Sequence, residues 1–242
     1  MSHDLSLEGL RHAGMRLVVG LIGTLAAVAV LMVMVVHVPD KWPAAVLALL
    51  LTAYPAVLVF QRRIDASARL TVSITVAAMP ALLLFISEGL VWQTDLHMLF
   101  FALLAAASIL CDWKALVAAT AVVAVHHLGL GMIMPQWLFS GDGSLARIAL
   151  HAVVLVVEAA TLIWVAQQIV ALVNANAAQT LERERAAEAL AEERAEQARI
   201  VQTVTTCLGE SLTALAAGNL TERISVEFPS DYALLKRDYN DA

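Results

Sequence analysis

Six uninterrupted apolar runs are the feature that most constrains how this chain can fold. As a helix rising about 1.5 Å per residue, each run is long enough to cross about 30 Å of hydrocarbon. Hydrophobic residues make up 60% of the chain and charged residues 15%, which is far from the balance of a water-soluble domain. We therefore predict an all-α membrane protein built on a bundle of six transmembrane helices. The runs cover residues 17–36, 43–60, 70–89, 91–111, 114–134 and 145–172.

The basic residues in the short segments between the runs predict the orientation of the bundle. One side has six of them and the other has only Lys41 and Arg147. Because cytoplasmic loops are enriched in Lys and Arg, we predict a multi-pass protein with both termini in the cytoplasm. The opposite loops are short, the longest spanning residues 135–144, so we expect the stimulus to be bound within the bundle. The six cytoplasmic residues are Arg11, Arg16, Arg62, Arg63, Arg69 and Lys114.

The sixth run continues without a helix breaker. Residues 171–198 are rich in Ala, Glu, Arg, Gln and Leu, which are good helix formers. We therefore predict that the last helix extends into the cytoplasm as a coiled-coil stalk, although Arg194 and Gln197 interrupt its heptads and a solvated single helix is the alternative. The predicted domains are a transmembrane sensor over residues 1–173, a helical linker over 174–201 and a last segment over 202–242.

The last segment has the pattern of a helix, a polar connector and a second helix. The first helix is predicted to end at Gly218 and the second to begin around Asp231. "LAAGNLTERI" from Leu215 to Ile224 and "FPSDYALLKRDYNDA" from Phe228 to Ala242 resemble the connector and second-helix opening of a HAMP domain, as found in methyl-accepting chemotaxis proteins. The resemblance implies a partial HAMP domain, a parallel homodimer and a bacterial inner-membrane location. In a full-length receptor it further implies a chemotaxis kinase and its adaptor as partners.

No sequence motif for phosphate transfer is present. The chain has no Gly-rich phosphate loop and no nucleotide-binding motif, so we expect no enzymatic activity. A kinase or cyclase output following the same kind of linker stays open as an alternative. Membrane lipid and a metal ion or small ligand are the expected partners, and nucleic acid is not.

Polar side chains inside the apolar runs are the candidate sensing groups, because such groups are expensive in hydrocarbon. Three runs each carry imidazole about 9 to 12 Å below the predicted outer boundary, as judged from the rise per residue. Adjacent residues on a helix diverge by about 100°, so the paired histidines cannot both face one point. Glu158 lies two turns below His151 on nearly the same face. The candidates are His97 in the fourth run, His126 and His127 in the fifth, and His151 and Glu158 in the sixth.

A metal site is the interpretation that this cluster favours. Neutral imidazole is a common metal ligand, and a site needs three or four donors from different elements. We therefore predict a metal site formed by His97, His126, His127, His151 and Glu158. Copper is favoured and zinc is next, since imidazole suits both ions and thioethers near the same level suit copper. These thioethers belong to Met98, Met132 and Met134, although packing alone would explain each of them.

Other ligands remain open for the same histidines. His97 and His151 could be the axial ligands of a haem b in a redox or gas sensor, although no C-x-x-C-H attachment motif is present. Clustered imidazoles also suit proton sensing, and quinone sensing is a further alternative. For any single histidine, a hydrogen bond between helices is the simplest explanation. Transport is disfavoured, because the runs show no obvious inverted repeat.

The membrane part carries a second resemblance. The stretches from Asp95 to Leu130 and from Leu150 to Trp164 look like the multi-span sensor region of some proteobacterial chemoreceptors. This resemblance implies a transmembrane chemoreceptor that senses within the membrane, and it does not carry over a ligand. The matching positions are His97, Asp112, Trp113, His126, His127, His151 and Glu158.

Overall fold

A computed structural model describes residues 6–36, 39–134 and 145–241 of the chain. Within these ranges all regular secondary structure is helical, which confirms the all-α prediction for the described residues. The chain divides into two compact units, Met1–Ala177 and Ala178–Ala242. The predicted end of the sensor at residue 173 falls close to this division, and the further boundary at residue 201 stays a prediction. The predicted outer loop over residues 135–144 lies outside the described ranges.

The first unit is a bundle of helices. In the described ranges, six helical segments are long and apolar enough to cross a membrane, one for each predicted run. The elements are α1 (Leu7–Val36), η1 (Pro39–Lys41), α2 (Trp42–Phe60), α3 (Ala66–Ile86), α4 (Gln93–His97), α5 (Leu99–Ala107), η2 (Ser108–Leu110), α6 (Trp113–Val125), the π-helical segment η3 (His126–Leu130), α7 (Gly131–Ile133) and the first part of α8 (Leu145–Ala216).

Two helix boundaries differ from those that hydropathy predicts. Helix α1 begins at Leu7 rather than near residue 17, because the Ser6 hydroxyl accepts a hydrogen bond from the Gly9 amide and caps the helix. The fourth run is not one helix, since it breaks at Met98 between α4 and α5. There the Met98 amide donates to the Asp95 carbonyl three residues earlier, which tightens the turn.

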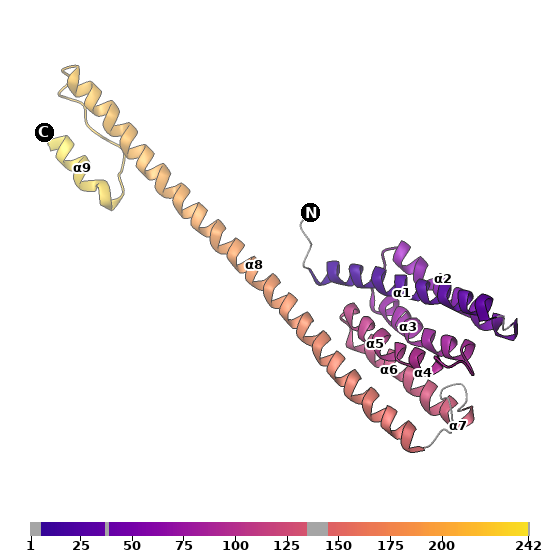
Figure 1. The fold of residues 1–242 in the computed structure, drawn as a ribbon. Coiled ribbons are helices and arrows are strands. Elements are labelled where there is room, and N and C mark those ends of the chain that lie inside the picture. The colour runs from indigo at the N-terminus through magenta and orange to yellow at the C-terminus, as the bar shows by residue number, and fades with distance from the viewer. Residues whose placement is uncertain (1–5, 37–38, 135–144, 242) are drawn as a thin grey trace. The chain divides into compact units, whose positions relative to one another are not determined.

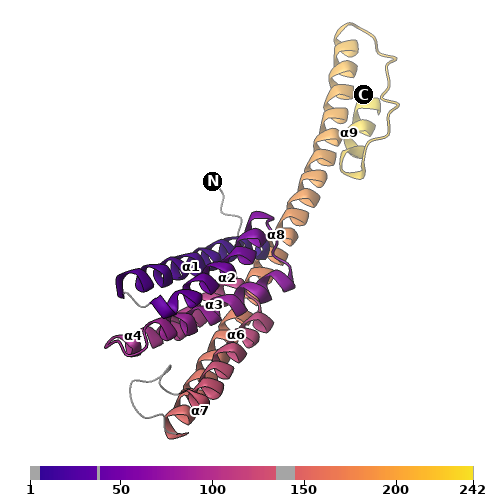
Figure 2. The same ribbon diagram turned by 90° about the vertical axis from the view of Figure 1, so that its right-hand side faces the viewer.

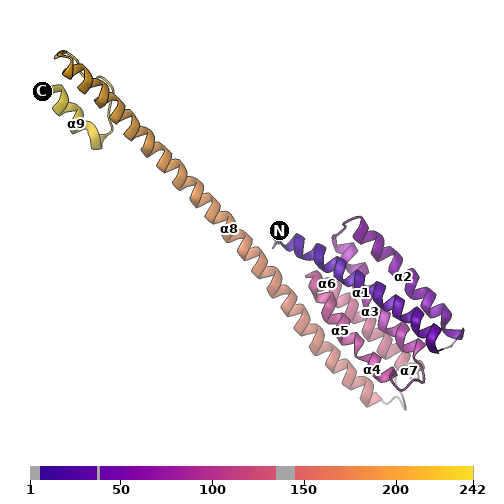
Figure 3. The ribbon, with the colours of Figure 1, turned by 45° about the horizontal axis from the view of Figure 1, so that its top comes forward.

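Helix α3 is the centre of the bundle. It packs against α1 and α2 on one side and against α5 and α6 on the other (Figures 1 and 3). Val72, Met79 and Leu83 of α3 are buried in the core with Ile22 of α1 and Leu116 of α6. The first unit also contains a cavity lined by residues of α5, α6 and α8.

A buried ion pair ties α3 to the start of α6. The Asp112 carboxylate lies 2.6 Å from the Arg69 guanidinium, and the two side chains are only 10% and 11% exposed. The same carboxylate caps α6 by accepting a hydrogen bond from the Lys114 amide at 3.0 Å. Arg11 of α1 donates to the Cys111 carbonyl at 3.0 Å, so three helices are joined at this end.

The second unit consists of the rest of α8, a connector and α9 (Ser230–Asp241), which lies beside the end of α8 (Figures 1 and 2). Val204 of α8 packs with Ile224 and Phe228 of the connector. The Asn240 amide group clamps the connector, since it accepts from the Ile224 amide at 2.8 Å and donates to the Ile224 carbonyl at 3.2 Å. The predicted order of helix, connector and helix is therefore found, and its HAMP identity stays a prediction.

Replacing Asp112 tests the ion pair. We expect Asp112→Ala to lower the free energy of unfolding in mixed detergent micelles by roughly 3–5 kcal/mol, because it leaves Arg69 buried and unpaired and removes the α6 cap. Asp112→Asn keeps a capping oxygen and should lose less. Glu196→Ala, which breaks the exposed pair with Arg199, should change stability by about 0.5 kcal/mol or less. A loss under about 1 kcal/mol for Asp112→Ala would contradict the assignment.

Candidate functional site

Three histidines that are distant in the sequence meet in the first unit. His97 is the last residue of α4, His127 lies in the π-helical segment and His151 lies near the start of α8. The ring centroids of His97 and His127 are 4.9 Å apart, those of His97 and His151 are 5.3 Å apart, and those of His127 and His151 are 5.6 Å apart. The structure therefore brings together the imidazoles that the rise per residue placed at one level.

The paired histidines face different surroundings, as their angular separation on a helix requires. Both rings lie 5.0 Å from the Phe100 ring, measured between centroids, and both side chains are buried, but His126 does not line the cavity described next. His127 does line it. The sequence could not decide between the two, and in the structure His127 is the one that faces the cavity.

The backbone around this pair is π-helical from His126 to Leu130. A π turn adds one residue to a turn of α-helix, which changes the direction of the side chains that follow, and such turns are frequent at functional sites. An ideal α-helical period therefore misplaces residues beyond Val125. No residue pattern announces the π turn in advance.

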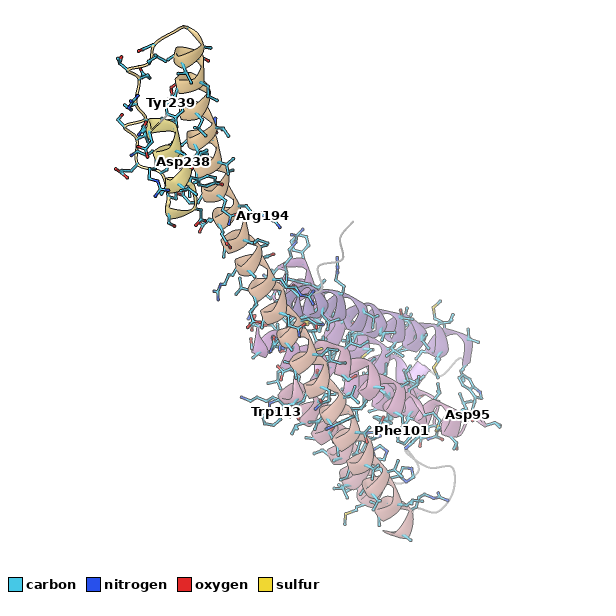
Figure 4. All side chains as sticks on the ribbon, turned by 90° about the vertical axis from the view of Figure 1, so that its left-hand side faces the viewer. Asp95, Phe101, Trp113, Arg194, Asp238 and Tyr239 are labelled. Carbon is cyan, nitrogen blue, oxygen red and sulfur yellow. The ribbon has the colours of Figure 1, made fainter. Side chains whose placement is uncertain are left out.

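A cavity of about 240 Å³ adjoins the three imidazoles. Its walls come from α5, α6 and α8 and are mostly apolar. Figure 4 labels Phe101, one of the wall residues. Besides the histidines, the polar lining consists of Thr120 and Glu158. The Thr120 hydroxyl donates to the Leu116 carbonyl, whereas no hydrogen-bond partner is found for the buried Glu158 Oε2 in the described part of the chain. The cavity thus presents three imidazoles and one carboxylate in an apolar enclosure.

Backbone carbonyls fix the ring orientation of two of the histidines. His127 Nδ1 lies 2.8 Å from the Val123 carbonyl oxygen, and His151 Nδ1 lies 2.8 Å from that of Arg147. A carbonyl oxygen only accepts, so each Nδ1 carries the proton in the neutral ring and each Nε2 keeps its lone pair. His97 Nε2, at 2.9 Å from His127 Nε2, is therefore the donor of that hydrogen bond. Histidines that bind metals are commonly oriented in this way.

The ring positions suit one metal ion, but the donor atoms are not yet convergent. Three imidazoles that bind one ion at about 2.0–2.1 Å have ring centroids about 5 Å apart, close to the separations seen here. In the described part of the chain, however, no three His, Cys, Asp or Glu side chains are arranged to hold an ion as they stand. The Nε2 atoms of His97 and His127 bond to each other instead. An ion would have to replace that hydrogen bond.

Two parts of the ligand prediction gain no support from this geometry. Met98, Met132 and Met134 are 64%, 71% and 36% exposed and none lines the cavity, so they supply no thioether to it. Two axial imidazoles of a haem need ring centroids roughly 6 Å apart with the macrocycle between them. His97 and His151 are closer than that, and His127 lies within 5.6 Å of both.

The sequence did not identify the residues that shape the cavity. Phe100, Phe101 and Thr120 lie in apolar runs where each looks like an ordinary packing or lipid-facing residue. Only the tertiary packing of α5, α6 and α8 brings them to one space. No periodicity signal could have selected them.

No protein-family model matches the chain, and no curated protein or solved structure matches it either.

The ring tautomers provide a direct test of the site geometry. We expect nitrogen-15 NMR of the histidine-labelled protein to show His127 and His151 protonated at Nδ1 and unprotonated at Nε2, because backbone carbonyls hold both Nδ1 atoms. His12, on the first turns of α1, provides the comparison, since no backbone carbonyl is shown to fix its ring. A dominant Nε2–H tautomer at His127 would contradict the arrangement.

Proposed function

We propose that this chain is a multi-pass sensor of the bacterial inner membrane that binds a transition-metal ion at His97, His127 and His151. The observation that carries the proposal is the meeting of three imidazoles at one apolar cavity, two of them with Nδ1 held by a backbone carbonyl. In that tautomer Nε2 carries the lone pair that a metal ion would take, and at His127 the ion would replace the hydrogen bond from His97 Nε2. We assign copper first and zinc second.

The outward-facing side chains support the membrane location. Phe60 is 89% exposed, Val156 65% and Leu31 59%, and each belongs to a helix long enough to span. Continuous apolar exposure of this kind is unfavourable in water and favourable in hydrocarbon. The distribution of Lys and Arg favours both termini in the cytoplasm.

The charge of the site favours a monovalent ion. Three neutral imidazoles leave the charge of a bound ion uncompensated, and a net charge is costly in an apolar enclosure. Among the described residues, Glu158 is the one carboxylate that lines the cavity, so it can offset a single positive charge. Cu(I) with Glu158 is neutral overall, whereas Zn²⁺ would leave one positive charge.

Helix α8 is the proposed route of the signal. It carries His151 and Glu158 in the first unit and extends to Ala216 in the second. Ion binding that draws His151 towards His97 and His127 would favour one position of α8, and typical couplings of this kind amount to about 1 to 3 kcal/mol. The second unit, which resembles HAMP, would pass the change on within a homodimer. In a full-length receptor the output would be a chemotaxis kinase and its adaptor, with no catalysis in this chain.

Metal binding by matched histidine variants tests the site. We expect Cu(I) to bind stoichiometrically to the full chain in nanodiscs, as measured by competition with a chromogenic chelator. His127→Ala should weaken it at least 100-fold, because it removes a direct ligand. The adjacent His126→Ala should bind Cu(I) like the native chain, since His126 does not line the cavity. Glu158→Gln should weaken binding by about 10–100-fold.

The competing explanations give different results in that measurement. Zn²⁺ bound more tightly than Cu(I) would overturn the charge argument. Native protein that binds neither ion would refute metal sensing and leave proton or quinone sensing for the cluster. Equal losses in His126→Ala and His127→Ala would show that the histidines act through packing.

Hydrogen exchange in the second unit tests signal transmission. We expect Cu(I) to change amide exchange around the cluster of Val204, Ile224 and Phe228, because that cluster joins α8 to the connector. The change should be lost in His127→Ala and kept in His126→Ala. Tight Cu(I) binding with unaltered exchange throughout residues 204–240 would refute transmission through α8.

A further inference from the structure

A second cleft, separate from the histidine cavity, lies between the first turns of α1 and the end of α2. Its volume is about 310 Å³. The lining divides into an apolar part, with Met15, Val59 and Phe60, and a basic part, with His12 and three arginines. A ligand that fits both parts has an anionic group next to an apolar one.

Only two of the three arginines are available to such a ligand. Arg63 is engaged, because its guanidinium donates to both carboxylate oxygens of Asp65 and to the Ser67 hydroxyl. These hydrogen bonds from Arg63 and Ser67 hold the pKa of the Asp65 carboxyl well below its usual range. Arg16 and Arg62 are exposed, and no hydrogen bond or ion pair is found for either guanidinium in the described ranges.

The backbone at Arg62 makes this arginine unexpected. Helix α2 ends with the Arg62 amide bonded to the Val59 carbonyl and the Arg63 amide bonded to the Leu58 carbonyl. In this type of helix end the residue at the place of Arg62 is left-handed and is usually glycine. Arg62 has a φ of 55°, a backbone conformation that is strained for any residue with a side chain. Glycine at this position would relieve the strain.

We propose that this cleft binds the phosphate of an anionic phospholipid headgroup, with Arg16 and Arg62 contacting the phosphate. The exposed Phe60 ring and Val59 would then lie along the glycerol and the first part of an acyl chain. A free phosphate ion has no apolar group that could pack against Val59 and Phe60. The proposal rests on the proposed membrane crossing, in which Arg16 and Arg62 fall at the cytoplasmic boundary, where basic pockets between helices bind acidic headgroups.

The nearby acidic groups do not cancel the positive charge of the cleft. The Glu8 carboxylate lies 3.9 Å from His12 Nε2, and the Asp65 carboxylate forms an ion pair with Arg63. Neither carboxylate is among the groups that line the cleft. Among the described residues that line the cleft, no carboxylate therefore offsets the charge of the two arginines.

Lipid retention measured by native mass spectrometry tests this site. We expect the full chain to retain phosphatidylglycerol over phosphatidylcholine, and the Arg16→Gln, Arg62→Gly double variant to lose this preference by roughly 30-fold, since each arginine near the headgroup contributes about fivefold. Arg183→Gln with Arg185→Gln removes the same charge from the exposed second unit and should retain the lipid normally. Arg62→Gly alone should not lower the melting temperature, because glycine suits this φ.

Each remaining outcome rejects part of the proposal. Equal retention of the two lipids, or equal loss in both double variants, would refute the headgroup site. Displacement of phosphatidylglycerol by inorganic phosphate would make a free phosphate ion the ligand instead. Cu(I) binding by the cleft variant separates the two sites, since failure here with intact Cu(I) binding leaves the proposed function standing.

Discussion

Apolar surroundings make an unpartnered polar group expensive, and this cost determines how the first unit is built. Where charge must be buried, it is paired: Arg69 with Asp112 at one end, and Lys41 with Glu88 at 2.6 Å, where the Lys41 ammonium also lies 3.6 Å from the centre of the Phe85 ring. Glu158 differs, because its Oε2 is buried in the cavity wall and has no partner within the described ranges. The bundle pairs these other buried charges but places this carboxylate oxygen and three imidazoles beside one cavity, which is why we propose that cavity as the site.

The helical bundle follows from the sequence because hydrocarbon-length apolar runs permit little else. Hydropathy reports only where side chains are apolar, however, and not where backbone hydrogen bonds begin or fail. It therefore misses the start of α1 at Leu7, which a Ser6 cap and polar helix-forming residues decide. It also misses the break at Met98, where one tighter turn separates α4 from α5 within a continuous apolar run.

The site, like the fold, can be predicted from the sequence only in part. The level of His97, His127 and His151 follows from counting residues, because the rise of a helix is nearly constant. The choice between His126 and His127 does not follow, since it depends on the rotation of α6 and on the π turn at its end. The cavity walls at Phe100 and Phe101 depend on the packing of separate helices, which no local pattern encodes.

The weak packing of α8 explains why a small ligand could move it. In its most apolar stretch only 11% of α8 is buried, compared with 61% of α3. Close-packed helices resist displacement, because each shift sacrifices many contacts. Helix α3 is therefore held by close packing on several sides. Helix α8 instead borders the cavity with part of its surface. An occupant that links His151 to His97 and His127 would supply contacts that packing does not. On the proposed mechanism, a coupling of about 1 to 3 kcal/mol would be enough to favour one position of α8.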